Sequence, residues 1–260
     1  MKLVKLLALA TLFVLAACSN STMGTVSFSL TSRQAAAPAP SAAFSSAAPA
    51  PSVTAAGDST VIALGNDTVI VRSAQLVLRK VELKRADVAS CDAIMGNGDC
   101  EEFETGPVLV SLPLGSALIA QQVSVAVPAG TFSALEFEIH KPSSSEDAAF
   151  IAANPDFANI SIRVTGTYSQ AGTRSAFTFT SDVNQSEESV LVPPVTVPEG
   201  QSLNVTLRAD ISGWFLNGAK TALVDPASAN KGQPNESVVA NNIQNSFDAF
   251  EDDDRDGLDG

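Results

Sequence analysis

The amino-acid sequence predicts an all-β protein, an antiparallel β-sandwich with a short inserted helix and a C-terminal helix. Val, Ile, Phe and Thr, which suit a pleated and half-buried surface, are frequent through the body of the chain. About ten short segments alternate apolar and polar residues between turn-forming residues, which is typical of a sandwich or a barrel. The clearest of them covers 203–211, where every second residue is apolar.

The N-terminus carries the pattern of a bacterial lipoprotein signal peptide, which we place at 1–17. Two lysines precede an apolar run that is too short to span a bilayer, which takes about 20 residues. The run ends in Leu15-Ala16-Ala17-Cys18, and the thiol of this cysteine can carry lipid. We therefore expect lipid, such as palmitate, on Cys18 and a place in the cell envelope. Ser19 favours the outer membrane if the cell has two membranes. The alternative is an ordinary signal peptide in which Cys18 is incidental.

Two segments connect this predicted anchor to the body of the protein. The lipid-anchored segment 18–33 contains Val26, Phe28 and Leu30 in alternation with polar residues. Its stretch 25–31 is therefore either a first strand or part of the tether. In 34–57, 19 of 24 residues are Ala, Pro or Ser and no apolar face repeats. This composition predicts a linker with polyproline II bias.

The body is predicted to be one β-sandwich domain over 58–234, which is long enough to bury a sizeable core. Gly65-Asn66-Asp67 is the turn of a first hairpin. Further along, the apolar positions change from even numbers up to Leu78 to odd numbers from Val81. A side-chain period of two cannot change faces without an inserted residue. We therefore expect a β-bulge near Arg79-Lys80.

The strand expected over 131–140 carries the candidate catalytic groups on its polar face, namely Glu136, Glu138 and His140. We expect His140 to be a solvated strand-end residue rather than the base of a Ser-His-Asp or Cys-His mechanism. Glu136 and Glu138 would lie about 7 Å apart, which would suit an inverting glycoside hydrolase. No aromatic sugar platform accompanies them. The segment 143–153 is the short inserted helix, and Asn154-Pro155 ends it.

Cys91 and Cys100 are the other two cysteines. An even pair in an oxidising compartment favours a disulfide. The residues between them include the turn-forming set Gly96-Asn97-Gly98-Asp99, so the bridge would close a hairpin-like loop. A zinc site is the weaker alternative, because no nearby histidines would complete its four ligands.

Apolar residues near the C-terminus recur at helical spacing, at Val239, Ile243, Phe247 and Phe250. This spacing predicts a C-terminal helix over 235–250 that docks one stripe on the sheet. Trp214 follows the long strand over 203–211. It either plugs the sandwich or stands exposed as a binding aromatic.

The acidic tail 251–260 carries the most specific chemical signal. Carboxylates alternate along it and Gly257 stands where a calcium loop turns sharply, as in the first half of an EF-hand or thrombospondin type 3 loop. A full EF-hand loop also needs a bidentate glutamate at position twelve, so Asp248 or Glu251 would have to complete the shell. The alternative is a solvated acidic terminus. The candidate Ca²⁺ ligands are Asp252, Asp254, Asp256, Leu258 through its carbonyl, and Asp259.

The net charge of −13 repels nucleic acid and anionic lipid headgroups, and favours cations, neutral glycans or other proteins as partners. The sequence contains no convergent set of base, nucleophile and oxyanion donors. We therefore predict a lipid-anchored cell-envelope protein with a structural, ligand-binding or protein-binding role and no catalytic activity. The alternative is an extracytoplasmic hydrolase that uses Glu136 or Glu138.

Three motifs support a family resemblance: Phe28-Ser29-Leu30-Thr31, Val127-Pro128-Ala129-Gly130-Thr131-Phe132 and Val197-Pro198-Glu199-Gly200. With the strand pattern over 25–226, they resemble a family of bacterial surface lipoproteins built on a domain of unknown function. The resemblance implies a transthyretin-like or immunoglobulin-like sandwich and no known activity.

Overall fold

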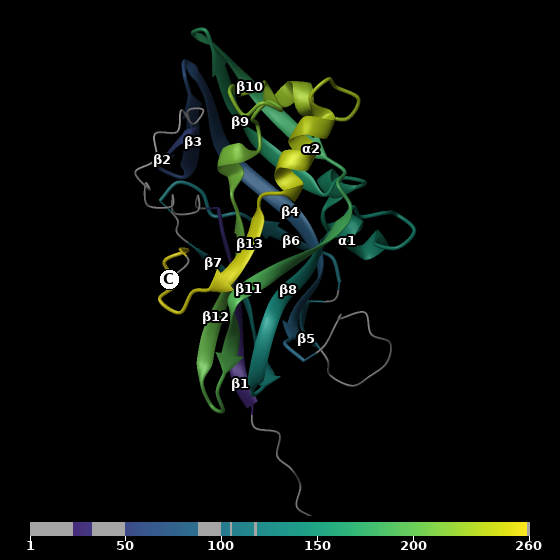
Figure 1. The fold of residues 1–260 in the computed structure, drawn as a ribbon. Helices are drawn as coiled ribbons and strands as arrows, with labels where there is room; N and C mark the ends of the chain where they lie inside the picture. Colours follow the sequence, from purple (N-terminus) through teal and green to yellow (C-terminus); the bar gives the residue numbers. More distant parts are fainter. Residues whose placement is uncertain (1–22, 33–49, 88–99, 105, 117–118, 259–260) are drawn as a thin grey trace, which may run out of the picture.

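The computed structural model describes residues 23–32, 50–87, 100–104, 106–116 and 119–258. These residues form two β-sheets around a continuous cluster of buried apolar side chains (Figure 1). The predicted all-β, sandwich-like fold with few helices is confirmed.

The smaller sheet has four strands, and it carries the C-terminal tail. All its neighbouring strands are antiparallel except β1 and β12, which pair in parallel. Its strands, in spatial order, are β13 (Phe247–Glu251), β12 (Ser202–Ala209), β1 (Met23–Thr31) and β7 (Ala120–Pro128).

The larger sheet has nine strands, and the long strand β4 (Asp67–Arg85) lies at its centre. Along one path the order is β10 (Thr173–Ser181), β9 (Ile162–Gln170), β4, β3 (Ser59–Leu64) and β2 (Ser52–Ala56). The other half of β4 pairs with β5 (Cys100–Glu104), β6 (Val108–Ser111) and β8 (Gly130–Ile139), and β8 also pairs with β11 (Gln185–Val197).

The helical segments are short and lie outside the sheets. They are α1 (Ala148–Ala153), η1 (Pro155–Phe157), η2 (Ile211–Gly213), η3 (Pro226–Ala229) and α2 (Glu236–Gln244). Among the residues that the structure describes, no helix combines the length and apolar character needed to cross a membrane. The short inserted helix expected over 143–153 is present as α1, but it begins only at Ala148, because residues 144–146 form a turn before its N-cap Asp147. It ends at Asn154 as expected.

Strand β1 is an inner strand of the smaller sheet, so the segment 25–31 is a strand and not part of a tether. It lies between β7 and β12, with Thr25–Thr31 in register with Ser202–Arg208. Val26, Phe28 and Leu30 are almost completely buried in the core. The first strand of the sheet therefore precedes the Ala/Pro/Ser-rich segment.

The predicted linker over 34–57 needs a correction at its C-terminal end. Residues Ser52–Ala56 form the edge strand β2, which pairs with β3 and places Val53 opposite Ile62. The pattern was missed because Val53 is the only apolar β-former in a run of small residues, and an edge strand needs only backbone hydrogen bonds to one neighbour. Residues 33–49 lie outside the described part of the chain.

The β-bulge predicted near Arg79-Lys80 is confirmed. The register between β4 and β8 shifts between Arg79 and Glu82, and Lys80 takes a φ of 51°. Leu78 before the shift and Val81 after it are both buried. The inserted residue therefore keeps both halves of a 19-residue strand facing the core.

The C-terminal helix predicted over 235–250 is wrong in its second half. Helix α2 ends at Gln244, and residues Phe247–Glu251 form β13 against β12. The break has a local cause, because the hydroxyl of Ser246 donates to the carbonyl of Ile243 and accepts the indole N–H of Trp214. Trp214 is fully buried and plugs the sandwich, as the first of its two alternatives predicted.

Candidate functional site

The polar face of β12 is buried and forms a hydrogen-bonded ladder that leads to the acidic tail. The hydroxyl of Ser29 donates to Asn204 (2.7 Å), the Asn204 amide donates to the hydroxyl of Thr206 (2.8 Å), and Thr206 donates to Asp252 (2.9 Å). All four side chains are at least 98% buried. Because every step is paired, the ladder avoids the cost of an unsatisfied buried polar group.

Asp252 organises the tail by accepting hydrogen bonds from it. Its carboxylate also accepts the backbone N–H groups of Asp256 (3.0 Å) and Gly257 (3.1 Å), which turn the chain back on itself. Gly257 has a φ of 77°, a left-handed conformation that favours glycine. Burial raises the pKa of the Asp252 carboxyl, although the hydroxyl of Thr206 and the two N–H groups oppose this shift.

The loop brings together three of the predicted metal ligands. Carboxylate oxygens of Asp252, Asp254 and Asp256 lie within 4.8 Å of one another, with Asp252 buried, Asp256 half-buried and Asp254 exposed. This cluster can hold a metal ion. Oxygen-only ligands of this kind suit a hard divalent cation rather than a thiolate- or imidazole-preferring metal.

A cavity of about 540 Å³ lies beside the cluster. The residues that line it show which of the remaining candidate ligands lie close to the three aspartates. Glu251 and Leu258 line it with the aspartates. Asp248 does not line it, because its carboxylate forms an ion pair with Arg208 (2.5 Å). Of the two carboxylates expected to complete the shell, only Glu251 is therefore placed to do so. Asp259 lies outside the described residues.

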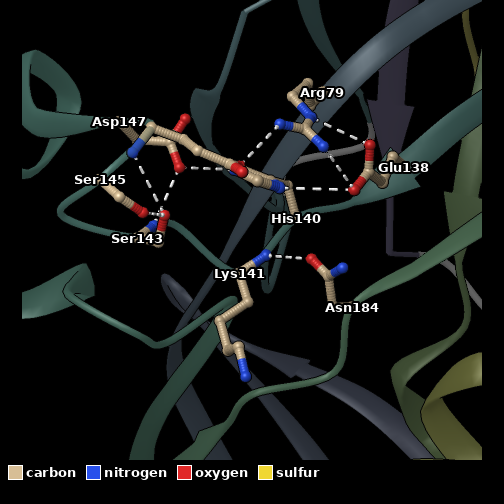
Figure 2. Close-up of polar contacts among 9 residues, drawn as sticks. Arg79, Glu138, His140, Lys141, Ser143, Ser145, Asp147 and Asn184 are labelled. Atoms are coloured by element: carbon tan, nitrogen blue, oxygen red, sulfur yellow. Dashed lines mark hydrogen bonds and ion pairs between the residues drawn. The ribbon is translucent and has the colours of Figure 1, made fainter.

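His140 lies in a buried polar network, so the expectation of a solvated histidine is wrong (Figure 2). Its Nε2 lies 2.8 Å from Asp147 and its Nδ1 lies 3.4 Å from Glu138. Glu138 in turn accepts two hydrogen bonds of 2.9 Å from Arg79. Asp147 also accepts the backbone N–H of Ser143 (2.9 Å), which closes the turn before α1. Since the same carboxylate contacts His140, this turn lies over the end of the strand. Both ring nitrogens face carboxylates, which leaves neither to serve a nucleophile.

Glu136 and Glu138 line one cavity of about 250 Å³ on the larger sheet, as the hydrolase alternative requires. Each is paired with a cation, since Glu136 lies 3.4 Å from the ammonium of Lys84 and Glu138 is held by Arg79. Lys84 is buried and also pairs with Glu188 (2.7 Å). Burial raises the pKa of Glu136. The two carboxylates therefore form structural ion pairs across strands.

The buried network predicts an acid-dependent contribution of Asp147 to stability. Burial would raise the pKa of this carboxyl, but the Ser143 N–H and His140 outweigh it and hold the pKa below its usual value. A depressed pKa stabilises the fold above the unfolded pKa of about 4, and this stabilisation is lost as the pH falls through the folded pKa. We expect Asp147→Asn to cost about 1.5 kcal/mol at pH 7 and progressively less below pH ~4.

Urea unfolding of both proteins between pH 7 and pH ~2.5 would measure this difference. Asp156→Asn is the matched control, because Asp156 is largely exposed and, within the described part of the chain, its one ion pair is with Arg163. Its effect should stay below about 0.5 kcal/mol at every pH. A cost of Asp147→Asn that is the same at low and neutral pH would contradict the assignment.

Two of the predicted sites stay predictions. Cys18 and Cys91 lie outside the described residues, so lipidation cannot be compared with the structure. Cys100 is disulfide-bonded, and its pairing with Cys91 stays a prediction. Cys100 opens β5, opposite Lys84 of β4. Comparison of the chain with protein-family models, with curated proteins and with solved structures finds no match.

Proposed function

We propose that this protein is a lipid-anchored component of the cell envelope with a non-catalytic structural or binding role, and that its C-terminal loop binds Ca²⁺. The observation that carries the calcium proposal is the clustering of the carboxylate oxygens of Asp252, Asp254 and Asp256 within 4.8 Å. Three carboxylates at that separation repel one another unless a cation lies between them. A divalent ion would therefore stabilise this folded loop.

Calcium fits the loop better than magnesium. Calcium accepts six to eight oxygen ligands in flexible geometry, whereas magnesium demands a near-ideal octahedron. The loop can offer the three aspartates, the Leu258 carbonyl and the Glu251 carboxylate, and Asp259 is a further candidate. We expect a dissociation constant in the range of extracellular calcium modules, on the order of 10⁻⁴–10⁻³ M.

Calorimetric titration of the full-length protein with CaCl₂ tests this assignment. Wild-type protein should bind one Ca²⁺ per chain, and the double variant Asp254→Asn/Asp256→Asn should not. MgCl₂ titrated in place of CaCl₂ should bind more weakly than CaCl₂. One-to-one binding that survives the double substitution would place the ion elsewhere.

The non-catalytic role is supported by the state of the candidate catalytic groups. His140 lies between two carboxylates, and Glu136 and Glu138 are both in ion pairs. A hydrolase would need one of these groups free to exchange a proton with a substrate. Glycan and envelope-protein partners agree with the net charge of −13, and nucleic acid does not.

The anchor proposal predicts a modified N-terminus. Mass spectrometry of the mature protein should find Cys18 as the first residue with acyl chains attached. Cys18→Ser should release the protein from the membrane fraction, because several acyl chains are needed for stable anchoring. Cys100→Ser is the control, since it should leave the membrane fraction unchanged. Unmodified wild-type protein in the soluble fraction would contradict the proposal.

A further inference from the structure

The C-terminal half of the chain forms a third cavity, about 560 Å³ in volume and open to solvent, between α2, η2 and the start of β13. This volume lies in the range of small-molecule sites, about 300–1,000 Å³. The cavity is independent of the calcium loop, whose aspartates do not line it. In Figure 1, α2 lies at the end of the molecule opposite the start of β1.

Three asparagines at the end of α2 supply much of the polar lining, and their bonding leaves groups free for a ligand. The amide of Asn242 donates to the carbonyls of Trp214 (3.1 Å) and Leu216 (2.8 Å), which leaves its side-chain oxygen as an acceptor. The amide of Asn245 donates to the backbone of Asn241 (2.7 Å) and leaves the same kind of acceptor. The side chain of Asn241 makes no hydrogen bond within the described chain, so it offers both a donor and an acceptor.

Ser212 adds a hydroxyl to this lining. It makes no hydrogen bond to the described residues, and it is not one of the buried side-chain atoms left without a partner there, so its oxygen is open to the cavity. The hydroxyl of Ser212 can therefore both donate to a ligand and accept from it. Its backbone N–H binds one carboxylate oxygen of Asp210 (2.9 Å), and the other oxygen of that carboxylate remains available to a ligand.

The charges of the lining cancel. Arg208 is committed to Asp248 and also lies over the ring of Phe250, 4.9 Å from its centroid. The remaining charged groups are Lys220 and Asp210, one of each sign. A phosphate would need surplus cations, and a metal ion would need surplus carboxylates. A neutral ligand with many hydrogen-bonding groups meets neither obstacle.

We propose that this cavity binds a neutral saccharide. Each sugar hydroxyl both donates and accepts. Asn241 and Ser212 offer both roles, and the side-chain oxygens of Asn242 and Asp210 offer acceptors. Phe247 and Leu216 supply apolar surface for the C–H face of a sugar ring. The low helix propensity of asparagine is consistent with this, because local sequence rules are broken most often at functional sites.

The only tryptophan of the chain is hydrogen-bonded to two residues of the cavity lining and can report on the cavity through them. The backbone carbonyl of Trp214 accepts a hydrogen bond from the Asn242 amide, and its indole N–H donates to the hydroxyl of Ser246 (2.8 Å). Both Asn242 and Ser246 line the cavity. The probes are D-glucose, D-galactose, D-mannose and N-acetyl-D-glucosamine, titrated into the full-length protein in a detergent without a sugar headgroup. At least one should change Trp214 emission saturably, with a dissociation constant in the millimolar range.

Asn241→Ala is the informative variant. Asn241 is exposed and Ala favours the helix, so the fold should survive, while the dissociation constant should rise at least about tenfold with the loss of two hydrogen bonds. Asn66→Ala, the same change on the exposed β3–β4 turn, should leave it unaltered. Glycine and glutamate are titrated in the same way for comparison. The proposal is overturned if no sugar gives a saturable change in Trp214 emission, or if only these two amino acids give one. It is also overturned if Asn241→Ala binds the sugar as well as wild type does.

Discussion

Calcium at about 10 mM is expected to raise the Tm of the full-length protein by roughly 3–10 °C. An ion that binds only the folded state stabilises it by RT ln(1 + [L]/Kd), which is about 1.4–2.7 kcal/mol for ligand at about 10–100 times Kd. The gain should reach the whole smaller sheet. The loop follows β13 directly, and Asp252 binds the buried Thr206 of β12.

Thermal unfolding followed by circular dichroism, with CaCl₂ against EDTA, measures this shift. The double variant Asp254→Asn/Asp256→Asn should be insensitive to calcium and slightly more stable than wild type in EDTA, because two mutually repelling charges are gone. Asp58→Asn/Glu199→Gln removes the same charge from exposed positions and should keep the full calcium response. A calcium shift of equal size in both double variants would mean that the tail is only a solvated acidic terminus.

Glu138→Ala is expected to lower the free energy of unfolding by about 3 kcal/mol, the lower end of the cost of leaving a buried charge unpaired. The substitution removes both hydrogen bonds to Arg79 and the partner of His140 Nδ1. Glu138 is 7% exposed, whereas the Arg79 side chain is one-quarter exposed, and partial solvation of the guanidinium limits the loss.

A matched control is available on the same arginine. Glu146 lies 3.9 Å from Arg79, but its side chain is two-thirds exposed. Glu146→Ala should therefore cost less than about 0.5 kcal/mol in the same urea titration. If the two substitutions lowered the free energy of unfolding by similar amounts, burial would not determine how much the Arg79–Glu138 pair contributes to stability.

The sequence predicted features whose cause lies within a short stretch of residues. The bulge at Arg79-Lys80 follows from a change of parity within one strand, and parity is visible in any sequence. The clustering of Asp252, Asp254 and Asp256 follows from their alternation and from Gly257. In both cases the residues that determine the geometry are within a few positions of one another.

Features that depend on distant segments could not be predicted in the same way. His140 occupies a solvent-facing parity, and it is buried only because the turn at Ser143–Asp147 folds back over the strand end. From the sequence, Asn204 and Thr206 are expected on the solvent-exposed face of a half-buried strand. They are buried because the C-terminal loop, about 50 residues further along the chain, covers them. Phe250 fits a helical stripe and a strand equally well, and pairing with β12 decides between them.

The position of β1 has a mechanical consequence for the proposed anchored protein. Only residues 19–22 separate Cys18 from Met23, so a pull on the proposed lipid would enter the domain at the first residue of β1. β1 is hydrogen-bonded on both sides, to β12 and to β7. Tension along β1 would have to shear both of these ladders at once, whereas the same tension on an edge strand would load only one ladder. The proposed membrane attachment would thus load the part of the sheet that resists extraction best.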